Sequence, residues 1–307
     1  MDENIIPTNV LYSSFILRQN LVSLVRTYPF LNIQTVATSV LGKPIYVIKL
    51  GNGPKKVFYS ASIHANEWIT SVVLMKFVED YAKTFVSNGT LYNYSIRRLF
   101  NTCSIYIMPM VNPDGVDLVT GNLPTTSQAY IRARSIASNF PDIPFPNGWK
   151  ANINGVDLNL QFPAGWENAK EIKYEQGFDK PAPRDFVGYG PLTEPESLAI
   201  YNFTLSHNFS LTISYHTQGQ EIYWNFQNIN PPRGYEIGQQ FANSSGYLLT
   251  EVPYNSSFAG YKDWFIQTYN RPGYTIETGI GENPLPISQF DEIYRDNLGI
   301  LVLGAIL

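Results

Sequence analysis

Three residues of types that bind metal ions follow stretches of apolar sequence in this chain. His64 directly follows the apolar run 57–63, and Glu67 lies three residues further on. His216 follows a second apolar run at 211–215. Residues three apart can face one point across the first turn of a helix. Two histidines and a carboxylate are a common ligand set of catalytic zinc. We therefore predict one zinc ion per chain, although a lone His-x-x-Glu pair also arises by chance.

A further acidic residue, Glu277, ends the apolar segment 274–276. A carboxylate beside a water molecule on zinc can act as a general base, so the chemistry favoured by these residues is hydrolysis of an amide bond. The alternative is an ordinary glutamate at a strand end, paired with a lysine or arginine. The remaining histidine, His207, has no such context, and we predict that it lies at a helix end or on the surface.

The elements that position these residues can be predicted from hydrophobic periodicity. We expect strands at 45–50, 57–61, 104–108, 211–215, 221–226 and 274–277, and helices at about 66–86, 194–207, 234–245 and 287–303. Alternation of strands and helices predicts an α/β protein with a mixed or mostly parallel sheet, covered on both faces. In such sheets a ligand binds at the carboxyl ends of the strands, where His64, His216 and Glu277 lie.

The chain has 307 residues and no repeat, linker or low-complexity tract. We therefore predict a single catalytic domain over 1–307, in which residues 1–42 form a helical segment packed on the rest. Residues 112–193 are dense in proline, glycine and asparagine. Because long ordered loops in compact enzymes usually build the site, we expect this stretch to form part of it.

Composition excludes several classes of protein. Hydrophobic residues make up 44% of the chain and charged residues 15%, which is typical of a globular protein. The net charge is −4 and there is no basic run, so we expect no nucleic-acid partner. No apolar stretch is long enough to span a membrane, and the N-terminus does not resemble a signal peptide. We expect a cytoplasmic protein, although a chain whose leader had been removed would look the same.

Four segments resemble, in the same order along the chain, those of the zinc carboxypeptidase family. Residues 62–70 resemble its metal-binding segment, 155–159 its substrate-binding loop and 214–217 the segment of its third ligand. Residues 263–264, followed by Glu277, resemble the segment of its catalytic base. The resemblance implies a twisted eight-stranded mixed sheet flanked by helices. It also implies zinc ligands at His64, Glu67 and His216, and a base at Glu277.

The substrate-binding positions depart from the family. Where family exopeptidases carry Asn-Arg to bind a free C-terminal carboxylate, this chain has Asn159 and Leu160. Leucine has no charged fork with which to bind a carboxylate. The substrate therefore continues past that position or carries its anion elsewhere. Tyr254 lies near the position of the family's mobile tyrosine, which closes over the substrate.

The cation that stabilises the oxyanion in the family is also replaced. Asn154 occupies roughly the position of the family's arginine, and Lys150 is the nearest cation. Either side chain could donate to the developing oxyanion, and loss of one such donor typically costs about 2.7–4 kcal/mol. Arg132 and Arg134 are weaker candidates, and Lys150 could equally be a solvated loop lysine.

Lys262 lies at the position where the family sets its specificity for the substrate side chain that follows the cut bond. A lysine at this position favours a substrate side chain that ends in a carboxylate. The alternative is an ordinary surface lysine. Diaminopimelate carries such a carboxylate. Segments 156–166 and 215–220 also resemble γ-D-glutamyl-diaminopimelate peptidases of this family. The resemblance implies a murein stem peptide as substrate, and, since no cell-wall-binding repeat is present, a soluble muropeptide.

Two other functions are compatible with the same residues. The first is a zinc carboxypeptidase or deamidase that acts on ordinary peptides with an unusual terminus. The second is a peptide-binding protein that keeps the fold but has lost catalysis, which the absence of both arginines favours. The complete ligand set and Glu277 argue against the second, because binding alone does not require a base.

Overall fold

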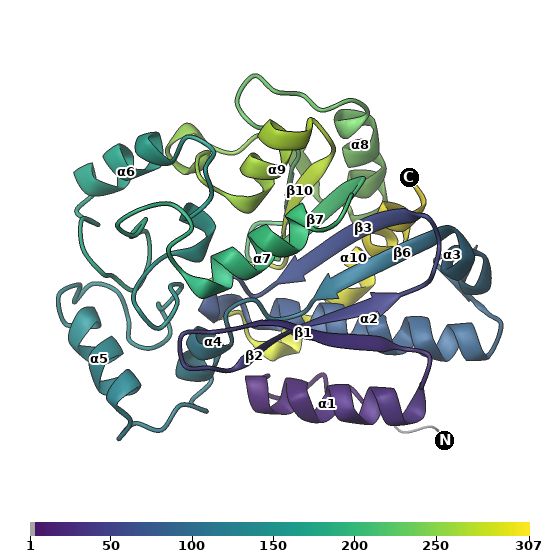
Figure 1. Ribbon diagram of the computed structural model, residues 1–307, viewed down its shortest axis with the longest axis horizontal. Helices are drawn as coiled ribbons and strands as arrows, with labels where there is room; N and C mark the ends of the chain where they lie inside the picture. Colours follow the sequence, from purple (N-terminus) through teal and green to yellow (C-terminus); the bar gives the residue numbers. More distant parts are fainter. Residues whose placement is uncertain (1–3) are drawn as a thin grey trace.

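The computed structural model describes residues 4–307 and has an eight-stranded mixed sheet at its centre (Figure 1). The predicted fold class is thereby confirmed. In spatial order the strands are β1 (Asn32–Thr38), β2 (Pro44–Leu50), β6 (Cys103–Met108), β3 (Lys55–Ala61), β7 (Leu211–His216), β10 (Gly273–Glu277), β8 (Glu221–Tyr223) and β9 (Leu248–Thr250). A separate two-stranded ribbon consists of β4 (Thr90–Leu91) and β5 (Tyr94–Ser95).

The four central strands β6, β3, β7 and β10 run parallel to one another. Strands β1 and β2 pair antiparallel at one side, and β8 pairs antiparallel with β10 at the other. Every residue of β6 and β7 is buried. Central parallel strands are covered on both faces, which explains why these segments are apolar runs without alternation. Their carboxyl ends meet at one edge of the sheet.

Helices cover both faces of the sheet. One face carries α1 (Ser14–Thr27), α2 (Ile69–Val86), α3 (Ile96–Thr102), α8 (Gly234–Ser245) and α10 (Phe290–Ile306). The other carries α7 (Pro195–Leu205) and α9 (Tyr261–Tyr269). Side chains of β3 alternate between the two cores: Val57 and Tyr59 pack on the first, and Phe58 on the second. The predicted helices agree with α2, α7, α8 and α10 to within a few residues.

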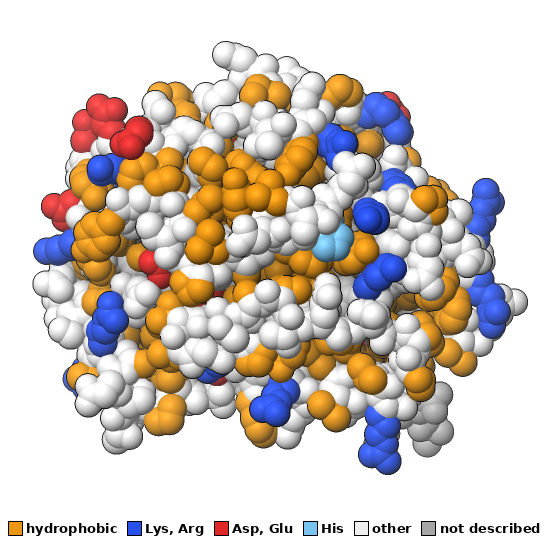
Figure 2. Space-filling model, viewed as in Figure 1, with side chains coloured by type: hydrophobic (Ala, Val, Ile, Leu, Met, Phe, Trp, Pro, Cys, Tyr) orange, Lys and Arg blue, Asp and Glu red, His pale blue; other side chains and the backbone are white. Residues whose placement is uncertain are grey.

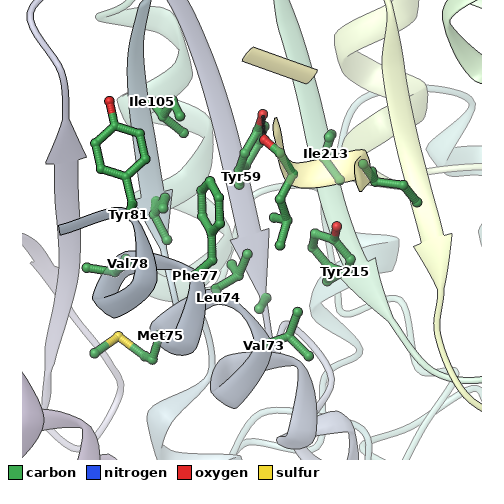
Figure 3. Packing of buried hydrophobic residues seen from close by; sticks show 14 of the residues in the cluster. Tyr59, Val73, Leu74, Met75, Phe77, Val78, Tyr81, Ile105, Ile213 and Tyr215 are labelled. Atoms are coloured by element: carbon green, nitrogen blue, oxygen red, sulfur yellow. Dashed lines mark hydrogen bonds between the residues drawn. The ribbon is translucent and has the colours of Figure 1, made fainter. Parts of the chain in front are cut away.

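Helix α2 packs through the stripe that its sequence predicts. Val73, Phe77 and Tyr81 are fully buried. Figure 3 shows this stripe against side chains of the sheet, among them Tyr59 of β3 and Ile213 of β7. Burial of a large apolar side chain contributes roughly 1.5–3 kcal/mol, so the stripe holds α2 firmly on the sheet. The start of α2 is thereby positioned directly after the carboxyl end of β3.

Two predictions about the chain's organisation need correction. Residues 1–42 contain not only a helix but also the edge strand β1, which pairs with β2. The residues of β1 are exposed or half-buried, so the strand lacks the strong apolar pattern that predicts the central ones. The stretch 112–193 contains helices α4 (Pro113–Val119), α5 (Gln128–Ala137) and α6 (Trp166–Glu175). In Figure 1, α5 and α6 lie beyond the arrowheads of β3 and β6.

Charged side chains are scattered over the visible face of the molecule. On the face seen in Figure 2, lysine and arginine side chains are spread singly among apolar and uncharged groups and form no continuous basic patch. Within residues 4–307, none of the helices combines the length and the apolar character that crossing a membrane requires. The single cysteine, Cys103, is buried, and burial raises the pKa of its thiol to about 12.

The turn before β3 provides a test of the packing. A Cβ atom on Gly53 would lie 1.9 Å from the backbone carbon of Thr102, whereas a Cβ on Gly190 would meet nothing closer than a methyl group at 3.5 Å. We expect Gly53→Ala to lower the free energy of unfolding by about 1–3 kcal/mol, because backbone must move to admit the methyl group. Gly190→Ala is the matched control. Urea denaturation measures both, and equal midpoints for the two variants would contradict the close approach.

Candidate metal centre and substrate cleft

Residues at the carboxyl ends of the parallel strands form the centre of the site. His216 and Glu277 are the last residues of β7 and β10, and the register pairs them directly. His64 follows β3 by three residues and precedes the short 3-10 turn Ala65–Glu67. Because β3, β7 and β10 are parallel, these three side chains from distant parts of the sequence come together at one edge of the sheet.

Local hydrogen bonds hold the segment between β3 and α2 in place. The hydroxyl of Thr70 accepts a hydrogen bond from the Ser62 N–H at 3.0 Å and donates to the Glu67 carbonyl at 2.7 Å. The Ala65 N–H donates to the Lys150 carbonyl at 3.0 Å. His64 and Glu67 are both buried. Their positions are therefore set by backbone and not only by the mutual contact of their side chains.

The side chains of His64, Glu67 and His216 converge on one point. Nδ1 of His64 lies 2.9 Å from Oε1 of Glu67, and Nδ1 of His216 lies 3.0 Å from Oε2. The two Nδ1 atoms are 3.1 Å apart. Two imidazole nitrogens and a carboxylate this close need a proton or a cation between them. This donor set fits a zinc ion with room for a further ligand.

Asp157 orients His64, a role that the sequence analysis missed. The Nε2 atom of His64 lies 3.2 Å from Oδ1 of Asp157, whose other oxygen accepts the Asp185 N–H at 3.2 Å. Burial by itself raises the pKa of Asp157, but the His64 ring, together with Lys150 and the Asp185 N–H, outweighs it and keeps that pKa well below its usual range. A carboxylate at Nε2 holds the proton there and leaves the Nδ1 lone pair for a metal. The sequence contained a signal for this residue, because Asp157 lies within the segment 155–159 that resembles a substrate-binding loop.

The negative charge around His64 is considerable. Burial lowers the pKa of His64, but Glu67 and then Asp157 outweigh it, and the pKa rises to about 9. The same field that favours a proton on this ring favours a metal cation beside it. Glu277 behaves in the opposite way: burial, followed by the nearby Glu67 carboxylate, raises its pKa to about 8. A carboxylate with such affinity for a proton is suited to proton transfer.

A cleft of two lobes extends from this centre. The first lobe has a volume of about 260 Å³, and its walls include both histidines, Asn159, Leu160 and Lys262. The second lobe has a volume of about 640 Å³, and its walls include Asn147, Thr217 and Asn283. The lobes share the walls formed by Lys150, Arg184, Tyr223 and Glu277. The centre therefore has space for a ligand on both sides.

Of the two predicted oxyanion donors, the structure brings only one to the cleft. Nζ of Lys150 lies 3.1 Å from Oε1 of Glu67, and the side chain lines both lobes. Asn154 does not line either lobe, because its side-chain N–H₂ donates to the Glu194 carboxylate at 2.8 Å. The prediction that Asn154 contacts substrate is therefore corrected. Arg132 and Arg134 are exposed on α5, away from these walls.

The predicted substrate-binding residues Asn159, Leu160 and Lys262 all line the first lobe. The side-chain oxygen of Asn159 accepts the Tyr261 N–H at 3.1 Å, and its N–H₂ group has no acceptor among residues 4–307. The ammonium of Lys262 is buried and already donates to the Asp263 carboxylate at 2.6 Å and to the Asn225 carbonyl. Lys262 thus has one proton left for a ligand, and a neighbouring carboxylate reduces its charge.

Tyr254 and His207 lie outside the cleft. Tyr254 is 64% exposed, and its ring packs edge-on against Phe258. Its chain neighbours Val252, Pro253 and Ser256 line the first lobe, so Tyr254 lies on the rim and not at the centre. His207 follows the end of α7, as predicted for a helix-end residue, and its Nδ1 atom contacts the Phe203 carbonyl at 2.8 Å.

Comparison with known proteins agrees with this geometry. The zinc carboxypeptidase family matches residues 17–299. This chain belongs to that family. The predicted zinc cofactor and the class of zinc-dependent peptidase are thereby confirmed.

Among individual proteins, γ-D-glutamyl-L-diamino acid endopeptidase 1 of Lysinibacillus sphaericus is 44% identical over 95% of this chain and 72% of its own length. The uncharacterised protein YqgT of Bacillus subtilis is 39% identical over 95% of this chain and 76% of its own length. Among solved structures, carboxypeptidase A from Helicoverpa armigera superposes with a TM-score of 0.74 at 18% identity, covering 100% of this chain and 76% of that one. That structural likeness shows the shared fold.

The ligand set can be tested by metal content. We expect His216→Ala to lose the zinc that the purified protein otherwise retains, with an affinity loss above about 100-fold, because a directly coordinating nitrogen is removed. His207→Ala is the matched control, since His207 lies outside the cleft, and it should keep one zinc per chain. Elemental analysis after dialysis measures both. Full zinc occupancy in the His216 variant would rule out this ligand set.

The orienting role of Asp157 leads to a separate expectation. Asp157→Asn should weaken zinc binding by roughly 10–100-fold, because the amide no longer holds the Nε2 proton of His64 as a charged acceptor does. Competition with a chelator of known affinity provides the measurement. Asp179→Asn, a change at an exposed position, serves as control. Equal affinities in the two variants would show that Asp157 does not tune the ligand.

Proposed function

We propose that this chain is a zinc endopeptidase that hydrolyses the γ-amide bond between D-glutamate and diaminopimelate in murein stem peptides. The observation that carries the proposal is a cleft that continues on both sides of the metal-binding group, with leucine at position 160. A substrate with chain on both sides of the cut bond fits this shape. The 44% identity to a protein named γ-D-glutamyl-L-diamino acid endopeptidase supports the same substrate.

Each residue of the centre has a role in this reaction. His64, Glu67 and His216 hold the zinc ion. When bound there, zinc supplies Lewis-acid activation of a water molecule and of the amide carbonyl. Glu277 takes the proton from the attacking water and passes it to the leaving nitrogen as the carbon–nitrogen bond breaks. Burial raises the pKa of Glu277, so this carboxylate has the affinity for a proton that carrying it from the water to the leaving nitrogen requires.

Lys150 stabilises the negative charge that develops on the carbonyl oxygen. Its ammonium lies beside Glu67 and lines both lobes, so it can reach an oxygen placed between them. Loss of one donor of this kind typically costs about 2.7–4 kcal/mol of transition-state stabilisation. A lysine can thus replace the arginine that the family uses at this step.

The first lobe receives the leaving diaminopimelate residue. Asn159 offers its free amide N–H₂ group, and Lys262 its remaining proton, to the carboxylates of that residue. Leu160 supplies an apolar wall and no anion-binding group, so a terminal carboxylate next to the cut bond is not required. Tyr254 closes over the leaving residue when the segment 252–257 moves inward from the rim.

A panel of defined peptides tests the proposal. The zinc-loaded enzyme is incubated with L-Ala-γ-D-Glu-diaminopimelate extended by D-Ala, with its α-linked isomer, and with an ordinary α-peptide. Mass spectrometry identifies the products. We expect release of a fragment that begins with diaminopimelate from the γ-linked peptide. Release of single C-terminal residues from the α-peptide instead would overturn the proposal in favour of an ordinary carboxypeptidase.

The assignment of Glu277 is tested with the same assay. Glu277→Gln should keep its zinc and lose roughly 10²–10⁴-fold in kcat, because the amide cannot accept the proton. Glu175→Gln, at an exposed position on α6, is the matched control and should retain wild-type turnover. Near-normal kcat in the Glu277 variant would show that another group acts as the base.

A further inference from the structure

Arg184 is a cation of the cleft that the catalytic steps above do not use. It lines both lobes, on the walls where they meet. Its Nε atom donates to Oδ2 of Asp185, and the side chain is 46% exposed. Within residues 4–307, the two terminal nitrogens of its guanidinium group have no hydrogen-bond acceptor. These two nitrogens form the fork that binds a carboxylate through two parallel hydrogen bonds.

The backbone that carries Arg184 is held against the loop segments that contain Lys150 and Asp157. The Pro183 carbonyl accepts the N–H groups of Lys150 and Ala151, at 2.8 and 2.9 Å. The Asp157 N–H donates to the Phe186 carbonyl at 2.8 Å. Arg184 therefore lies in a segment that is tied on both sides to the loop of Lys150 and Asp157. A cation on such a support is positioned before a ligand arrives, which reduces the entropy lost on binding.

Arg184 shares its ion-pair partner with a second cation. The Asp185 carboxylate is shared between Arg184 and Lys173, whose Nζ lies 2.7 Å from Oδ1. The other carboxylates in these ion pairs also face cationic groups: Glu67 contacts Lys150, His64 and His216, Asp157 contacts His64, and Asp263 contacts Lys262. Arg184 thus shares its anionic partner with Lys173, and its terminal nitrogens have no acceptor among residues 4–307. A guanidinium group in this arrangement favours an anionic group of the ligand.

We propose that Arg184 is a specificity-determining residue that binds the free α-carboxylate of the γ-linked glutamyl residue on the acyl side of the cut bond. This inference rests on the proposed function. A glutamyl residue joined through its side-chain carbonyl keeps its α-carboxylate, close to the bond that is cut. An ordinary α-linked residue without a side-chain carboxylate presents no such anion there. With the leaving residue in the first lobe, the acyl residue lies toward the second, and Arg184 lines both.

Two roles of Arg184 can be distinguished: binding of the α-carboxylate, and donation of a hydrogen bond to the reacting oxygen. A donor to the reacting oxygen accelerates every amide substrate to the same extent. A residue that binds the α-carboxylate accelerates only substrates that carry this group. The ratio of kcat/KM between two peptides that differ at the α-carboxylate alone therefore distinguishes the two roles, and it is insensitive to a fraction of misfolded protein.

The test uses zinc-loaded enzyme and two γ-linked peptides, one with D-glutamate and one with its α-carboxamide, D-isoglutamine. Wild-type enzyme should prefer the free carboxylate by about 10- to 100-fold in kcat/KM, as expected for a charge-assisted pair of hydrogen bonds. In Arg184→Gln this ratio should fall toward one, and in Arg184→Lys it should take an intermediate value. Arg132→Gln, which changes an exposed arginine on α5, should keep the wild-type ratio.

Two results would overturn the inference while leaving the proposed function intact. One is a wild-type enzyme that cuts both γ-linked peptides equally well. The other is an Arg184→Gln variant whose kcat/KM falls by the same factor for both peptides, which would assign Arg184 to the reaction itself or to the fold. Wild-type enzyme that cuts α-linked peptides but neither γ-linked peptide would overturn the proposed function first, and this inference with it.

Discussion

The parallel alignment of β3, β7 and β10 is the constraint on which the site depends. Hydrogen bonds between these strands bring their carboxyl ends to one edge, and the register sets His216 directly beside Glu277. The segment after β3 then needs to carry His64 and Glu67 only a short distance to meet them. Strands that are buried on both faces cannot slip by one residue without exchanging the side chains that pack in the two cores. The precision of the centre thus comes from the packing of the sheet.

Charge compensation is the second constraint, because the centre buries several ionisable groups. His64, Glu67 and His216 are nearly inaccessible to solvent, and Asp157 lies directly behind them. Isolated buried charges are strongly unfavourable, and such groups persist where partners or a metal balance them. Here Lys150 contacts Glu67 and Asp157 contacts His64. A zinc ion completes this arrangement, since it brings positive charge to a point that three donor atoms already face.

Loops from the long stretch 112–193 carry the residues that we propose set the specificity of the site. Segments around Lys150, Asp157 and Arg184 bond to one another through backbone groups and form one wall of the cleft. The same wall carries an orienting carboxylate and two cations on a common support. The end of the sheet therefore positions the metal-binding group and Glu277, whereas the loops carry the charged groups that we propose recognise the substrate.

The sequence by itself determined the parts of this protein that depend on local pattern. Apolar runs and helical periodicity predicted the central strands and α2, α7, α8 and α10, because these elements bury wide apolar faces. Spacing and position at strand ends identified His64, Glu67, His216 and Glu277 as a group. The edge strand β1 was missed, since half-exposed residues leave a weak pattern.

Only the tertiary structure decided the roles that depend on contacts between distant segments. Asn154 and Lys150 were equivalent as oxyanion donors in the sequence, and the bond between Asn154 and Glu194 separates them. The position of Tyr254 on the rim likewise follows from its packing against Phe258. Asp157 lies within the segment 155–159, but its contact with His64 and the surroundings of Arg184 are set by the folding of distant segments. The sequence therefore determined the metal centre, and the folding of the loops decided what surrounds it.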